Sequence, residues 1–230
     1  STRSLALWEA MAEDMGVDLG FRRCGLLYLS NDQAELDGWA QWGRFARGEG
    51  VDTRMLDSAE ASARGAATGQ AWAGGVWSPT DGIADPSRAA PLIAQGAIKH
   101  GATVVQNCAA RGIETSAGAV SAVVTERGTI KTSQVVLSGG AWAGSFLHQS
   151  GIFFPQASVR SSILSLEPVP RDLPDALHTA AASVTRRQNG GYTVAVSGRS
   201  HFDPTMRMIA GAKHFLPMFA KRWKSLSPGG

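Results

Sequence analysis

The chain has 230 residues, of which 43% are hydrophobic and 18% are charged, with a formal net charge of +3 and a sequence pI of about 9.1. This length and composition exclude a miniature scaffold and are typical of a globular protein with one or two domains. No segment approaches the roughly 18 consecutive apolar residues that cross a bilayer, and the first residues lack the order of a signal peptide, so we expect a cytoplasmic protein without a membrane span.

Charge and cysteine content exclude two further classes. Lys and Arg are scattered along the chain without a basic run, so the sequence does not favour nucleic-acid binding. Cys24 and Cys108 lack the paired spacing of zinc or iron–sulfur sites. We therefore predict no metal site and expect both cysteines to be buried thiols.

The first third of the chain predicts two amphipathic helices with a strand between them. Apolar residues recur at helical spacing from Ser4, the expected cap, to Met15, and Gly16 ends the pattern. The apolar run 21–29 predicts a buried strand. A second helix begins after Asp32, where Glu35 completes a capping-box pattern, and its tryptophans are expected in the core.

The middle of the chain predicts an α/β unit. A short helix is expected at 57–60, and loop with an edge strand at 65–82. A further helix begins at Asp85-Pro86 and ends near His100, because proline is tolerated at a first helical position. Four short runs rich in β-branched residues then predict strands at 103–105, 112–115, 119–124 and 134–137.

An extended region follows Gly151, where prolines at positions 155, 168, 170 and 174 exclude long helices. A strand is expected at 159–166. Two more strands, at 183–187 and 192–196, flank Asn189-Gly190-Gly191, which is typical of a hairpin turn. The last expected element is an amphipathic helix over about 204–223, broken or kinked at Pro217.

The stretch from Val135 to Ala143 is the most informative about function. An apolar strand leading through Gly139 and Gly140 into a helix lets backbone approach a ligand at the helix start. A tight strand-to-helix turn without a ligand explains the same pattern, and two glycines are not a nucleotide fingerprint.

The order of these motifs resembles the FAD-dependent oxidoreductases of the D-amino-acid oxidase, glycine oxidase and sarcosine oxidase family. The similarity is concentrated between Asp85 and Trp142 and extends more loosely over the whole chain. It implies an α/β fold with α+β character, in which a partial FAD-binding domain with a β-meander accompanies an antiparallel-sheet substrate domain. Residues 83–150 would belong to the FAD-binding domain, and 1–82 (with the N-terminal helix) and 151–230 to the substrate domain.

By position, the resemblance also assigns residues to FAD. Ala110 would offer its backbone to the adenine, Ser138, Gly139 and Gly140 would lie near the cofactor, and Trp142 would pack beside the turn or serve as a core aromatic.

On the substrate side the resemblance gives weaker assignments. Trp77, Arg160 and Tyr192 are candidates around a small amine or amino acid, and an arginine can pair with a substrate carboxylate through two hydrogen bonds. The sequence itself favours an ordinary surface or edge-strand charge for Arg160 and cross-strand packing for Tyr192. No catalytic acid or base is predicted, because in this family the flavin accepts the hydride and the protein chiefly positions the substrate.

The chain departs from the family's pattern in one important respect. No G-x-G-x-x-G turn is present to bind the FAD pyrophosphate, and the family's C-terminal segment would follow roughly where this chain stops. Two hypotheses follow. The chain is an incomplete flavoenzyme that oxidises the C–N bond of a small amine or amino acid, or it is a non-catalytic subunit whose partner supplies the missing flavin-binding segment.

Overall fold

A computed structural model describes residues 2–170, 173–197, 200–202, 205–222 and 226–228. Contacts within the chain divide it into two compact units. The first unit comprises residues 1–102 and 161–198, and the second comprises 103–160 and 199–230. Each unit is discontinuous in sequence, so segments far apart along the chain meet within it.

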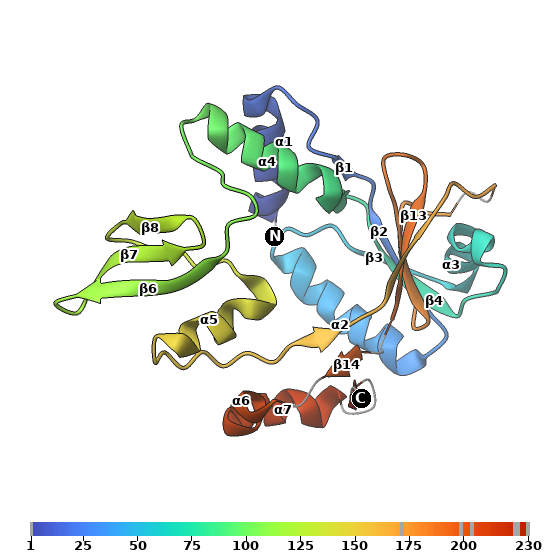
Figure 1. The fold of residues 1–230 in the computed structure, drawn as a ribbon. Helices are drawn as coiled ribbons and strands as arrows, with labels where there is room; N and C mark the ends of the chain where they lie inside the picture. Colours follow the sequence, from blue (N-terminus) through green and yellow to red (C-terminus); the bar gives the residue numbers. More distant parts are fainter. Residues whose placement is uncertain (1, 171–172, 198–199, 203–204, 223–225, 229–230) are drawn as a thin grey trace. The chain divides into compact units, whose positions relative to one another are not determined.

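The first unit is built on a mixed seven-stranded sheet (Figure 1). Only the β11–β2 pair is parallel, and the other neighbours are antiparallel. The strands in spatial order are β10 (Ile163–Leu166), β13 (Tyr192–Val196), β12 (Ala182–Arg186), β11 (Ala176–His178), β2 (Leu26–Ser30), β4 (Gly74–Ser78) and β3 (Arg54–Leu56).

Alternation along β2 explains how helices cover both faces of this sheet. Leu27 and Leu29 are buried on one face, in a core cluster that includes Ala61 of α3 (Ser58–Arg64). Tyr28 points to the opposite face and meets Trp39 of α2 (Gln33–Gly48), with ring centroids 5.8 Å apart. Successive side chains of a strand point to opposite faces, so one pentapeptide holds a helix on each side.

The helix starts follow the expected cap chemistry with one correction. The Asp32 side chain accepts a hydrogen bond from the Ala34 N–H, but Glu35 turns away and accepts from the Ser30 hydroxyl at 2.7 Å. The capping box lies instead at α3, where Asp57 and Glu60 exchange hydrogen bonds with each other's backbone. Both helices therefore begin where the sequence predicted.

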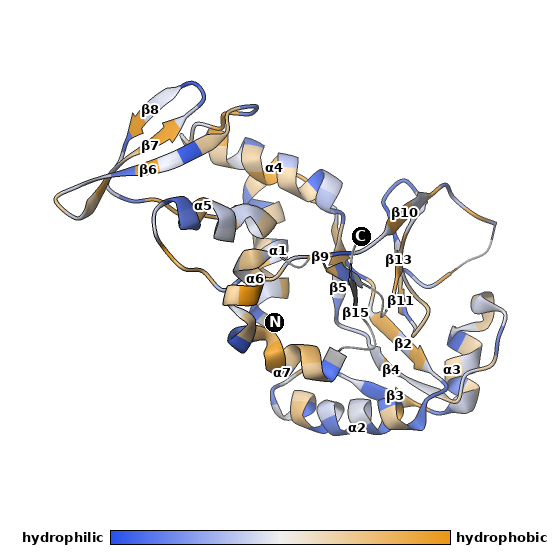
Figure 2. Cartoon of the chain, turned by 60° about the horizontal axis from the view of Figure 1, so that its bottom comes forward, coloured by the Kyte–Doolittle hydropathy of each residue, from blue (hydrophilic) through white to orange (hydrophobic). Residues whose placement is uncertain are grey.

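Two further helices and a short ribbon complete the first unit. Helices α1 (Thr2–Met15) and α4 (Pro86–Lys99) lie side by side (Figures 1 and 2), and a Cβ on Gly96 would lie 2.6 Å from Cε of Met15. Helix α1 begins two residues before its expected cap. The ribbon pairs β1 (Phe21–Arg23) with β5 (Gly82–Ala84).

Three expectations for this unit are wrong. The run 21–29 is two strands, because the chain turns at Gly25, whose φ is +74°. Besides a turn of helix, η1 (Ala66–Thr68), segment 65–82 contains β4, which lies inside the sheet between β2 and β3 rather than at an edge. Trp42 of α2 is 48% exposed and so lies outside the core.

The second unit contains the expected β-meander and a second small sheet. Strands β6 (Ala110–Ser116), β7 (Ala119–Thr125) and β8 (Gly128–Lys131) pair antiparallel in sequence order, and apolar residues concentrate on β7 (Figure 2). The other elements are listed here in chain order: η2 (Gly140–Trp142), α5 (Ala143–Gln149), β9 (Val159–Arg160), β14 (Ser200–Phe202), α6 (Met206–Ala210), α7 (Ala212–Arg222) and β15 (Leu226–Pro228). The second sheet has the order β15-β14-β9.

Residues 103–105 and 134–137 are not strands, contrary to expectation. Neither segment pairs with a strand in the described part of the chain, and a strand without a ladder has no partner for its backbone groups. Val104 is 42% and Val136 is 90% exposed. The high strand propensity of these two segments is therefore not enough to form a strand when no neighbouring strand pairs with them.

The C-terminal helix is also divided differently from the prediction. It breaks between α6 and α7 at Gly211, whereas α7 continues through Pro217. The expected ends at 204 and 223 lie outside the described residues.

Cys24 and Cys108 are free and half-buried rather than buried. Among the described helices none combines the length and apolar character that a bilayer crossing requires.

The turn at Gly25 yields a stability prediction. A Cβ there would overlap the Trp77 ring, and a positive φ is unfavourable for alanine. Gly25→Ala should lower the free energy of unfolding by about 2–4 kcal/mol in urea denaturation followed by circular dichroism.

Gly38→Ala is the matched control. Gly38 lies inside α2, where a Cβ meets nothing within 4 Å, so alanine should raise stability by about 0.5–1 kcal/mol. Equal effects of the two substitutions would contradict the close contact between Gly25 and Trp77.

Candidate cofactor and substrate sites

The glycine turn of the second unit is open on its outer side. Gly140 has a φ of +53°, and a Cβ on it would meet nothing within 4 Å. Ser138 and Gly140 are exposed, Gly139 is half-buried, and Trp142 is 77% exposed, so its expected core role is excluded. The turn thus presents bare backbone and one aromatic ring to its surroundings.

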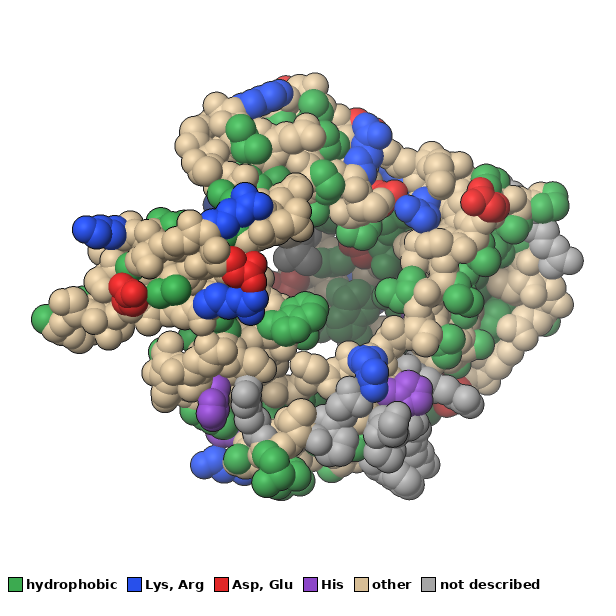
Figure 3. Space-filling model, viewed as in Figure 1, with side chains coloured by type: hydrophobic (Ala, Val, Ile, Leu, Met, Phe, Trp, Pro, Cys, Tyr) green, Lys and Arg blue, Asp and Glu red, His purple; other side chains and the backbone are tan. Residues whose placement is uncertain are grey.

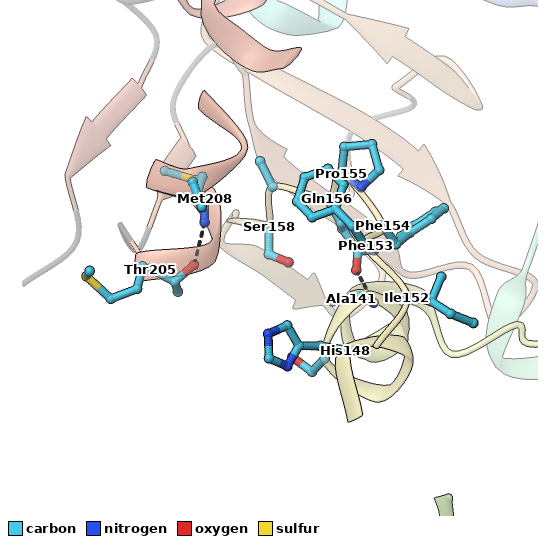
Figure 4. A pocket seen from close by; sticks show the side chains of 15 residues that line it. Ala141, His148, Ile152, Phe153, Phe154, Pro155, Gln156, Ser158, Thr205 and Met208 are labelled. Carbon is cyan, nitrogen blue, oxygen red and sulfur yellow. Dashed lines mark hydrogen bonds between the residues drawn. The ribbon is translucent and has the colours of Figure 1, made fainter. Parts of the chain in front are cut away.

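One side chain from a later segment holds this turn. Gln156 donates from Nε2 to the Gly140 carbonyl at 2.7 Å. Its Oε1 accepts the Gly144 N–H at 2.8 Å (Figure 4). Gly144 lies in the first turn of α5, where backbone N–H groups lack partners within the helix. Gln156 therefore satisfies a helix-start donor and joins both sides of the short η2 turn.

Ala110 lies at the start of β6, which is an edge strand of the meander. An edge strand has one row of backbone groups without ladder partners, and Ala110 is exposed beside an irregularity in the β6–β7 pairing. Such backbone can bind the edge of a planar heterocycle. The turn and this edge fit the flat, backbone-bound parts of a dinucleotide, whereas the sequence offers no glycine-rich cradle for its pyrophosphate.

A cavity of about 550 Å³ adjoins the turn within the second unit. Its lining is largely apolar, with Phe153, Phe154 and Met208 among its walls (Figure 4), and this volume is in the range of small-molecule pockets. Gln156 also lines it. The cavity lies beside the turn's clamped side, and the exposed ring of Trp142 does not line it.

The three substrate candidates are not assembled into one cluster. Trp77 and Tyr192 belong to the same sheet, but β12, β11 and β2 lie between their strands, which separates them by about 19 Å at the usual strand spacing. Trp77 lies under the Arg64 guanidinium, 5.0 Å from its ring centroid. Arg160 belongs to β9 of the second unit and is exposed.

Tyr192 is part of a charged cluster that the sequence did not reveal. Its side chain is 1% exposed, and the Arg186 guanidinium lies 5.0 Å from its ring centroid. Asp175 joins Arg186 at 2.7 Å and Arg22 at 3.3 Å. The Tyr192 hydroxyl is buried and has no hydrogen-bond partner among the described residues. These pairings involve residues as far apart as 22 and 186, so no local sequence motif predicts them.

A second cavity, of about 340 Å³, lies in the first unit near the start of α2. Its polar lining comes from Ser30, Asn31, Asp32, Glu35, Gln70 and Thr179. Next to Thr179, His178 Nδ1 lies 2.6 Å from the Ser183 hydroxyl. Burial lowers the pKa of His178, although the Glu35 carboxylate opposes this shift.

The described residues on the face drawn in Figure 3 show no continuous basic patch. On the face drawn in Figure 3, Lys and Arg side chains are spread over several elements with acidic side chains among them. Arg111 of the meander, for example, is paired with Glu126.

Comparison with known proteins identifies the class that this fold and turn define. The family model described as "FAD dependent oxidoreductase" matches residues 1–224. The chain belongs to this family of FAD-dependent oxidoreductases, as the order of its motifs predicted. The α/β fold with its meander and antiparallel strands agrees with solved structures of the family, and FAD is the family's cofactor.

Three relatives show the extent of the similarity. Glycine oxidase of Geobacillus kaustophilus is 28% identical over 235 residues, covering 99% of this chain and 57% of that protein. Sarcosine oxidase subunit beta of Rhizobium meliloti is 26% identical over 162 residues, covering 66% and 38%. The structure of L-amino acid deaminase from Proteus myxofaciens in complex with anthranilate superposes with a TM-score of 0.88 at 28% identity, covering 98% and 52%. The chain therefore spans between 38% and 57% of the length of these relatives.

The buried Tyr192 hydroxyl, which has no hydrogen-bond partner among the described residues, yields a stability prediction. Removing a buried polar group that has no partner costs nothing and relieves its desolvation. Tyr192→Phe should therefore leave the free energy of unfolding unchanged or raise it by up to about 1 kcal/mol in urea denaturation. A fall of more than about 1 kcal/mol would show instead that the hydroxyl has a partner, such as a buried water.

The environment of His178 predicts a pH dependence. Its pKa is lowered in the folded state from the ordinary value of 6.5, so the unfolded chain binds the proton more readily. Its contribution is present above about pH 6.5 and is lost as the pH falls below it. The urea midpoint should therefore fall less between about pH 7.5 and 5.5 in His178→Gln than in the unaltered chain. Equal slopes would contradict this role.

Proposed function

We propose that this chain forms part of a flavoenzyme that oxidises the C–N bond of a small amine or amino acid. The observation that carries the proposal is the glycine turn at 138–142, which is held in place and open in a chain of the FAD-dependent family. The similarity to glycine oxidase, sarcosine oxidase and L-amino acid deaminase supports amine or amino-acid substrates.

In the second unit, backbone groups and one aromatic ring are proposed to bind FAD. Gly139 and Gly140 have no side chains to obstruct a close approach, and the exposed Trp142 ring offers a flat apolar surface beside them. Ala110 offers the backbone of an edge strand to the adenine. When bound, FAD supplies the acceptor for the hydride that leaves the substrate carbon.

The first unit is proposed to contribute the substrate sheet, with Trp77 as the candidate; Tyr192 is 1% exposed and is therefore assigned to packing within the sheet rather than to substrate. Arg160 of the second unit is the candidate for a substrate carboxylate, because its exposed guanidinium can bind both oxygens at once. We assign no catalytic acid or base. A cytoplasmic location stays a prediction.

A second candidate function is that of a subunit whose partner completes the flavin site. The observation that favours it is apolar surface on strand-prone segments without ladder partners among the described residues: Val104, Val105 and Val136 are 42%, 47% and 90% exposed. A partner strand could pair with such backbone. Sarcosine oxidase subunit beta is, by its name, one chain of a larger assembly.

One experiment separates the two candidates. The purified chain is mixed with FAD, passed through gel filtration and examined for the visible absorption of bound flavin. The first candidate predicts a yellow protein whose colour is bleached anaerobically by an amine or amino acid such as glycine or sarcosine. A protein that stays colourless would contradict flavin binding by this chain alone and would support the second candidate.

Two glycine substitutions sharpen this experiment. Gly140→Ala places a side chain on the open side of the turn, so it should weaken FAD binding about tenfold, as fluorescence titration would show. Gly118→Ala is the matched control, since Gly118 also has a positive φ, of +80°, and open space around it, but lies in the β6–β7 hairpin. Equal loss of FAD affinity in both variants would contradict a role for the turn.

A further inference from the structure

Among the described residues, Gln156 is the one side chain that makes hydrogen bonds to both sides of the η2 turn. It follows Pro155 in the segment that leads to β9, 16 residues after Gly140 and 12 residues after Gly144. An amide is suited to this position because it donates and accepts at once, so it can bind a carbonyl and an N–H group together.

The fit around Gln156 is close. A Cβ on Gly144 would lie 3.0 Å from Oε1 of Gln156 and 3.4 Å from its Cβ, so glycine at 144 leaves room for the amide. The glutamine is half-buried and contacts the turn from the side that faces the cavity. The space beside the Gly140 Cα is open, because a Cβ there meets nothing within 4 Å.

We propose that Gln156 is a positioning residue for the cofactor, which fixes the glycine turn in the conformation that receives FAD. It acts through the backbone of Gly140 and Gly144 and does not itself contact the cofactor. This inference rests on the proposed function, because it gives the turn its role.

The physical argument is one of preorganisation. Glycine has more accessible backbone conformations than any other residue, so a turn containing Gly139 and Gly140 loses much conformational entropy when a ligand orders it. A turn already held by two hydrogen bonds has met that cost during folding. FAD should therefore bind more tightly to the clamped turn than to a loosened one.

The test compares two variants with a control. Gln156→Met keeps the length of the side chain but removes both hydrogen bonds, and Gly144→Ala crowds Oε1 without altering Gln156. Gln188→Met is the matched control, because Gln188 also makes a side-chain hydrogen bond, to Asp18 at 2.8 Å, within the first unit. FAD affinity is measured by quenching of flavin fluorescence, thermal stability by circular dichroism, and exchange of the Gly144 amide without FAD by NMR.

Gln156→Met should speed exchange at Gly144 and weaken FAD binding about tenfold, the ratio that corresponds to about 1.4 kcal/mol. Gly144→Ala should weaken FAD binding by a smaller factor without lowering the melting temperature, because alanine favours the helix. A merely structural role would make affinity follow stability. The control should alter neither Gly144 exchange nor FAD affinity.

Three results would overturn the inference. Unchanged exchange at Gly144 in Gln156→Met would show that the hydrogen bond does not hold the turn in solution. Faster exchange with FAD affinity within about twofold of the unaltered chain would refute the positioning role alone and leave the proposed function standing. Failure of the unaltered chain to bind FAD would contradict flavin binding by this chain alone and, with it, the role of Gln156 in that binding.

Discussion

The first unit depends on the burial of strand β2 between β11 and β4. Leu27 and Leu29 are almost completely buried on one face, while Tyr28 on the other face contacts both Trp39 and His178. Because β11 pairs with β2 in parallel, residues about 150 positions apart in sequence become neighbours. Burial of these few side chains thus holds strand β2, from the N-terminal part of the chain, in the same sheet as the β12–β13 hairpin.

The second unit depends on backbone hydrogen bonding rather than on a large apolar core. Its meander leaves β6 as an edge strand, and its glycine turn is held by the Gln156 amide. Both features keep backbone accessible, which is what a flat cofactor bound through main-chain groups requires. The same open backbone, with the exposed valines of 103–105 and 134–137, also explains why a completing strand is a reasonable second hypothesis.

Much of the fold could be predicted because its signals are local. The cap at Asp85-Pro86, the hairpin turn at Asn189-Gly190-Gly191 and the first two strands of the meander lie where the sequence placed them, whereas the third strand, β8, was not predicted. The errors share one cause, which is tertiary context. Strand-prone residues at 134–137 have no ladder, and β4 is central only because β2 and β3 flank it.

The candidate site was predictable to a smaller degree. The two glycines and Trp142 were visible in the sequence, since strand-to-helix turns carry a local pattern. The role of Gln156 was not visible in the sequence, because a single amide in a proline-containing stretch forms no local pattern. Only the fold brings it to Gly140 and Gly144. The charged cluster around Asp175 was hidden for the same reason, as its arginines come from two distant strands.

We propose that the glycine turn and the β6 edge of this chain form one backbone wall of a flavin site. Hydrogen–deuterium exchange with and without FAD tests it most directly, since a bound cofactor shields the backbone that it covers. The account predicts slower exchange on adding FAD in peptides that span 138–144 and the start of β6, with little change in the β12–β13 hairpin. Protection elsewhere with none at the turn would contradict it.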